Sequence, residues 1–98
     1  MTKFVVTVTV DKGKTTCNPV SVIVDPGDSV RWTCEDGDLA VEFKNSPFTS
    51  TQIWTAARDQ LTPVAIVKPN LPHGTRFQPT ISILEKEVAE SLGDLIVR

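Results

Sequence analysis

Alternation of apolar and polar residues between positions 19 and 43 is the feature that most constrains this fold. Such alternation is typical of β-strands with one buried face. The inward residues of three successive strands are expected to be Val20, Val22 and Val24, then Val30, Trp32 and Cys34, then Leu39, Val41 and Phe43. Residues 25–28 (DPGD) fit a type II turn, because proline presets φ and glycine accepts a positive φ. This turn does not match the twist of a tight hairpin, so its strands are expected to diverge, as in a chain crossing between two sheets.

Further strands are expected on both sides of this segment. Residues 4–10 place Phe4, Val6, Val8 and Val10 on one face, and residues 64–67, 77–83 and 95–97 are shorter candidates. Residues 53–61 fit either a helical turn or an edge strand, and residues 84–92 fit either a two-turn helix or a hairpin extension. About six to eight short strands between turn signals, with at most one or two short helical turns, favour an all-β sandwich.

Length and charge limit the classes of protein to consider. The 98 residues predict one domain, residues 1–98. The net charge of −2 and pI of about 5.2 give no basic face, so no nucleic-acid partner is expected. No apolar run reaches the roughly 20 residues that cross a bilayer, and no signal peptide is recognisable. We therefore expect no membrane partner and a cytoplasmic location, or an exported one if a leader peptide was removed.

The strand pattern resembles the core of a cupredoxin, a small copper-carrying β-sandwich. Cupredoxins have a P-x-x-I-x-V-x-x-G-D pattern followed by V-x-W or V-x-F, and the matching residues are Pro19, Val22, Val24, Gly27, Asp28, Val30 and Trp32. Val41 and Phe43 fit the next strand, and residues 73–77 (HGTRF) resemble the lead into the family's penultimate strand. The resemblance covers about two thirds of the chain and implies a Greek-key β-sandwich.

The copper ligands of that family have no counterparts in this sequence. The family's first histidine would lie at Leu39, and residues 77–98, which would supply the other ligands, contain no Cys, His or Met. A blue-copper site needs two imidazoles, a thiolate and usually a thioether. The chain has one histidine, His73, and one methionine, Met1. The sequence therefore predicts a cupredoxin-like domain with no copper, no other metal and no cofactor.

Other reactive arrangements are poorly supported. A zinc site from Cys17, Cys34 and His73 lacks the usual ligand spacing. The acidic turn at 35–38 lacks the remaining ligands of a calcium loop, so a solvated turn is expected. No G-x-S-x-G elbow or phosphate loop is present, and His73 is expected to be exposed, so no enzyme is predicted. Cys17 and Cys34 are expected to be reduced, with Cys34 buried, and a single disulfide is the alternative.

A binding or structural role is the remaining prediction, with an unknown protein or small ligand as partner. Phe48 and Trp54 lie in irregular sequence and are the candidate contact residues for a partner. The alternative is that they cap an open end of the sandwich. A generic immunoglobulin-like interaction or assembly domain is the alternative function, and a small hydrolase or a metal-binding protein is less favoured. Homo-oligomerisation through an edge strand is left open.

Overall fold

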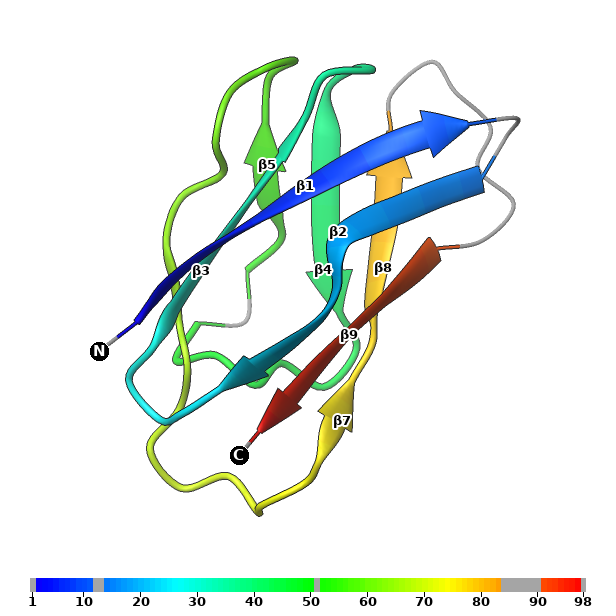
Figure 1. Ribbon diagram of the computed structural model, residues 1–98. Helices are drawn as coiled ribbons and strands as arrows, with labels where there is room; N and C mark the ends of the chain where they lie inside the picture. Colours follow the sequence, from blue (N-terminus) through cyan, green and yellow to red (C-terminus); the bar gives the residue numbers. More distant parts are fainter. Residues whose placement is uncertain (1, 12–13, 51, 84–90, 98) are drawn as a thin grey trace.

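A computed structural model describes residues 2–11, 14–50, 52–83 and 91–97, and all its regular elements there are β-strands. The strands are β1 (Lys3–Asp11), β2 (Lys14–Val24), β3 (Ser29–Cys34), β4 (Leu39–Phe43), β5 (Trp54–Ala56), β6 (Ala65–Ile66), β7 (Arg76–Phe77), β8 (Pro79–Ile83) and β9 (Ser91–Val97). A large sheet has the order β6-β3-β1-β2-β9-β7, and a small sheet has the order β5-β4-β8. Figure 1 shows β1 and β2 passing in front of the small sheet, as expected for a β-sandwich.

Strand β1 lies in the middle of the large sheet. It pairs in parallel with β3 on one side and antiparallel with β2 on the other. Val6 and Val8 are buried, whereas Val5, between Phe4 and Val6 in the chain and on the opposite face of the strand, is 49% exposed. The predicted alternation of β1 is therefore confirmed, because its even residues face the small sheet and its odd residues face water.

The turn at residues 25–28 has the predicted geometry. Gly27 has a φ of +87°, and the Asp28 N–H donates to the Asp25 carbonyl oxygen at 3.1 Å. The positive φ explains why glycine occupies this position. Strands β2 and β3 diverge as predicted, but they do not lie in different sheets. Both belong to the large sheet, where β1 separates them.

Asp28 joins this turn to the start of β1. Its side chain is 3% exposed, and each carboxylate oxygen accepts one backbone N–H at 2.8 Å. The donors are Thr2, which precedes β1, and Asp25, which begins the turn. The carboxylate thus satisfies two backbone donors that no strand pairing reaches.

Strand β2 is longer than predicted and changes face along its length. Its register with β9 shifts between Thr16 and Ser21, a stretch that includes the cis peptide bond between Asn18 and Pro19. Before the shift Cys17 points inward, and after it Val22 points inward. The expectation that Val20 faces the core is wrong, since this side chain is 59% exposed. Between Thr16 and Ser21 strand β2 advances five positions while β9 advances two, and this odd number of extra residues reverses the alternation.

The middle of the chain forms short strands rather than helical turns. Within residues 53–61 the structure contains β5, which pairs antiparallel with β4. Residues 77–83, expected as one strand, are divided between the sheets, because β7 pairs with β9 and β8 pairs with β4. Thr62, which precedes β6, is hydrogen-bonded to β3, because its hydroxyl accepts the Trp32 N–H at 3.0 Å.

The region predicted as helix or hairpin, residues 84–92, falls mostly outside the described residues. Ser91 begins β9, so the last strand is longer than the predicted 95–97. It pairs in parallel with β2 on one side and antiparallel with β7, the edge strand, on the other.

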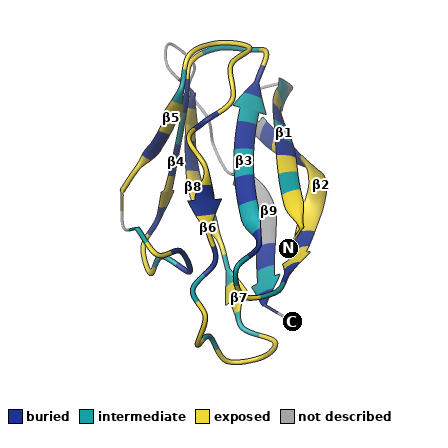
Figure 2. Ribbon diagram, turned by 90° about the vertical axis from the view of Figure 1, so that its left-hand side faces the viewer, coloured by how far each residue is buried: buried dark blue, intermediate teal, exposed yellow. Residues whose placement is uncertain are grey.

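One continuous hydrophobic cluster fills the space between the sheets. Figure 2 shows buried residues along strands of both sheets and exposed residues on β2 and in the loops. Its largest members are the rings of Trp32, Phe43, Phe48 and Trp54, with valines from β1 to β4 around them. No helix in the described part of the chain is long and apolar enough to cross a membrane.

Candidate functional site

A buried aliphatic side chain lies at the position where the cupredoxin pattern has its first histidine. Leu39 begins β4 and is 2% exposed. Its partner on β8 is Ile83, which is 4% exposed. Neither side chain has a donor atom for a metal ion. Residues 84–90, where further ligands would be expected, lie outside the described residues, and their sequence (LEKEVAE) contains no Cys, His or Met.

The two cysteines lie on either side of β1. Val8 is in register with Cys17 of β2 and with Cys34 of β3, and all three side chains are buried. Two strand spacings of about 4.8 Å place the cysteine Cα atoms about 10 Å apart. A disulfide needs a Cα separation below about 7 Å. Both thiols are free in the structure, which confirms the prediction of unpaired cysteines.

The zinc ligands considered from the sequence are not brought together. His73 is exposed in the loop between β6 and β7, whereas Cys17 and Cys34 are buried inside the sandwich. Across the described residues, no group of three or more His, Cys, Asp or Glu side chains has a metal-binding arrangement.

The acidic turn at residues 35–38 has a structural use that the sequence analysis missed. The Asp36 carboxylate accepts the Val10 N–H at 2.8 Å, and the Asp38 carboxylate accepts the Arg58 N–H at 2.9 Å. The Arg58 guanidinium donates from Nε to the Glu35 carbonyl oxygen at 2.8 Å. The turn therefore fastens the end of β1 and the segment after β5.

Phe48 and Trp54 are not exposed anchors. Both side chains are 0% exposed. They form an aromatic cluster with Trp32 and Phe43, in which every pair of ring centroids lies within 6.3 Å. Their burial contradicts the interpretation as exposed anchors and agrees with the alternative that they pack against the sandwich: β5 turns Trp54 toward the core, and a bridge between Phe48 and Val67 holds Phe48 inside. The Trp54 indole N–H is buried with no hydrogen-bond partner in the described structure, so packing holds the ring in place.

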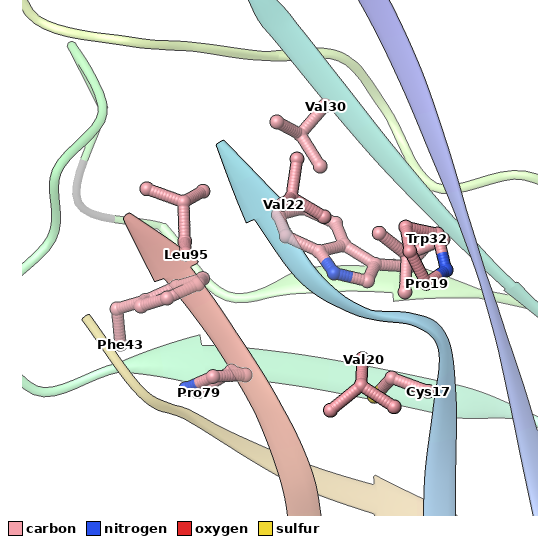
Figure 3. A pocket seen from close by; sticks show the side chains of 10 residues that line it. Cys17, Pro19, Val20, Val22, Val30, Trp32, Phe43, Pro79 and Leu95 are labelled. Carbon is pink, nitrogen blue, oxygen red and sulfur yellow. The ribbon is translucent and has the colours of Figure 1, made fainter. Parts of the chain in front are cut away.

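A small apolar pocket lies between the two sheets; we call it the inter-sheet pocket. Its volume is about 20 Å³. Its walls are Val6, Cys17, Pro19, Val20, Val22, Val30, Trp32, Phe43, Pro79 and Leu95, and Figure 3 shows these side chains around one space. The pairing of β1 with β2 ends at Thr7 and Asn18. The exposed wall residues, Pro19 and Val20, follow directly, so the pocket opens to solvent where β2 leaves β1.

The thiol of Cys17 lies in the wall of this pocket. It is 4% exposed, and burial raises its pKa to about 11 from an ordinary value of 9.0. Burial disfavours the thiolate because the charged form loses hydration. A nucleophilic role is therefore not supported, since nucleophilic cysteines have a lowered pKa.

Titration of this thiol should make stability fall at high pH. Between about pH 9 and 11 the unfolded chain has lost the Cys17 proton and the folded protein retains it. The stabilisation is thus complete below pH 9 and is lost as the pH rises to about 11. We expect the free energy of unfolding to fall over this range by on the order of 2 kcal/mol more in the wild type than in Cys17→Ala. Urea unfolding at a series of pH values measures it, and parallel curves for the two proteins would contradict it.

A second, wider hollow lies over the ends of β4, β5 and β8. It measures about 620 Å³ and is lined by Asp38, Leu39, Ala40, Thr55, Ala56, Ala57, Ser82 and Ile83. Small side chains on neighbouring strands produce this shape. Its Asp38 carboxylate already accepts the Arg58 N–H. Neither hollow could be predicted from the sequence, because each combines residues from strands that are distant in the chain.

Comparison with known proteins shows similarity of fold. No protein-family model matches the chain, and no curated protein matches its sequence significantly. A reduced amicyanin variant superposes with a TM-score of 0.58 at 12% identity, covering 95% of this chain and 81% of the amicyanin. An oxidised amicyanin variant has a TM-score of 0.57 at the same identity and coverage. A pseudoazurin from Sinorhizobium meliltoi has a TM-score of 0.56 at 14% identity, covering 100% of this chain and 75% of the pseudoazurin. The chain therefore has a cupredoxin-like fold.

Proposed function

We propose that this cupredoxin-like chain is a non-catalytic module that binds a ligand or partner, or serves a structural role, and carries no copper. The pair of Leu39 and Ile83 is the observation on which this rests. The position of the first copper histidine holds a leucine that packs against a buried isoleucine. Residues 84–98 contain no histidine or cysteine that could supply a second ligand. The chain thus has the β-sandwich of a cupredoxin, with aliphatic side chains at the position of the first copper ligand.

The absence of catalysis is part of the same proposal. His73, the one imidazole in the sequence, is exposed in a loop. The raised pKa of Cys17 keeps that thiol protonated at neutral pH. His73 lies in an exposed loop and Cys17 is buried in the sandwich, so the structure does not pair this base with this thiol. The cytoplasmic location stays a prediction from the sequence, which identifies no partner and leaves homo-oligomerisation open.

Titration with Cu(II) and with Cu(I) tests the metal-free part of the proposal. We expect no stoichiometric tight binding and no intense visible absorption band, because the ligand set of a blue-copper site is missing. His73→Ala is the matched control, since weak Cu(II) binding that disappears in this variant belongs to an exposed imidazole. A visible charge-transfer band, or tight binding that is lost in Cys17→Ala or Cys34→Ala, would overturn the proposal.

A further inference from the structure

We propose that the inter-sheet pocket binds the short, uncharged aliphatic end of a small molecule, whose polar end stays in water beside Val20. The inference deepens the proposed binding role, on which it rests, by naming a class of ligand. The pocket does not include the position of the missing copper ligand, because Leu39 and Ile83 are not among its wall residues.

The chemistry of the walls selects an uncharged apolar group. The ten wall residues are apolar apart from the Cys17 thiol, a weak hydrogen-bonding group, and the Trp32 indole N–H, a single donor. A charged or strongly polar ligand would lose its hydration there and gain too few partners to replace it. An alkyl group loses no hydrogen bond on entering, and its transfer from water is favourable. The raised pKa of Cys17 agrees with a poorly hydrated wall.

The size of the pocket limits the group to a few carbon atoms. A volume of about 20 Å³ admits the centres of one or two water-sized groups. The end of a chain of about two or three carbons meets this limit, whereas a ring or a fatty acyl chain exceeds it. The open side of the pocket determines where the rest of the ligand lies.

An exposed apolar residue borders the opening. Val20 is 59% exposed and belongs to the wall. Val5 and Ile23 are also exposed, but they alternate with the wall residues Val6 and Val22 and therefore lie on the outer face of the large sheet. Val20 offers contact to the carbons that follow the inserted end, and the polar head remains in solvent.

A series of straight-chain alcohols from ethanol to n-octanol, followed by methyl NMR of the wild-type protein, tests the proposal. We expect saturable shifts at the methyl groups of the wall residues Val20, Val22 and Leu95 and none at Val64, which is exposed outside the pocket. Affinity should rise about fourfold for each added CH₂ at first and then level off as the pocket is filled. Absence of saturable shifts, equal shifts at Val64, or a steady rise up to n-octanol would each overturn the proposal.

Two matched variants test the position of the opening. Val20→Phe places a ring at the exposed side of the pocket, and Val64→Phe makes the same change at a valine of similar exposure elsewhere. We expect Val20→Phe to weaken n-butanol binding about tenfold or more and Val64→Phe to leave it unchanged. Equal affinity in both variants would overturn the inference. If Val20→Phe does not fold, the wild-type shifts decide the question alone.

The outcome is separable from that of the copper titration. Tight copper binding with normal alcohol binding overturns the proposed copper-free role and leaves the pocket assignment standing. Absence of both kinds of binding overturns the pocket assignment and leaves the copper-free role standing.

Discussion

Replacing Phe48 with alanine should lower the free energy of unfolding by about 3–5 kcal/mol. The ring is 0% exposed, and its centroid lies 5.0 Å from that of Trp54 and 5.2 Å from that of Phe43. Its removal leaves a cavity between rigid aromatic rings that cannot close without moving both sheets. Urea unfolding followed by tryptophan fluorescence measures the loss directly, because the Phe48 ring contacts both Trp32 and Trp54.

Ile53→Ala is the matched control for this variant. Ile53 lies in the same connection between β4 and β5 but is 51% exposed, so its truncation should change stability by less than about 0.5 kcal/mol. If Phe48→Ala costs less than about 1 kcal/mol, the ring is not a core residue in solution. The interpretation of Phe48 as an exposed partner contact would then be restored.

The strands near the start of the chain were predictable because their pattern is local. In β1, β3 and β4 each residue alternates between a face that packs on the other sheet and a face that meets water. Every second residue is apolar as a direct consequence. The turn at Gly27 was predictable for the same reason, since proline and glycine determine its φ angles within four residues.

The misassignment of Val20 shows where local reasoning ends. The sequence from Pro19 to Val24 alternates as if one strand ran through it. The shift of register with β9, between Thr16 and Ser21, includes the start of this stretch and turns Val20 outward while Val22 and Val24 remain inside. A register shift depends on the partner strand, which lies about seventy residues away in the sequence, so the pattern of β2 alone does not reveal it.

The sequence left two alternatives open for Phe48 and Trp54 for a related reason. Their neighbours in sequence show no period, and irregular sequence usually lies at the surface. Their burial depends on distant partners: Trp54 pairs with Val41 of β4, and Phe48 forms a bridge with Val67. An aromatic side chain in an irregular segment therefore needs a tertiary contact to place it, and such contacts are not visible in the sequence.

The candidate sites divide in the same way. The lack of a copper-ligand set could be predicted, because coordination requires particular residue types and the sequence shows that they are missing. The inter-sheet pocket could not be predicted, because its ten wall residues come from six strands of both sheets. Its existence depends on β2 leaving β1 after Asn18, which is a feature of the assembled sandwich.

Asp28→Ala should cost about 2–4 kcal/mol, the second-largest loss that we expect from a single substitution. The carboxylate is 3% exposed and accepts the backbone N–H groups of Thr2 and Asp25, each at 2.8 Å. Alanine leaves both donors without this acceptor, and an unsatisfied buried donor costs about 1–3 kcal/mol. Urea unfolding measures the loss, and hydrogen exchange at the Thr2 and Asp25 amides should become faster in the variant.

Two further variants separate hydrogen bonding from charge. Asp28→Asn keeps one oxygen acceptor but turns an NH₂ group toward the second donor, so we expect a loss between those of the wild type and Asp28→Ala. Glu42→Ala removes the same charge from an exposed position on β4 and should change stability by less than about 0.5 kcal/mol. Equal losses in Asp28→Ala and Glu42→Ala would show that net charge is responsible. A loss confined to Asp28, together with faster exchange of the two amides, would show that this one carboxylate holds β1, the turn and β3 together.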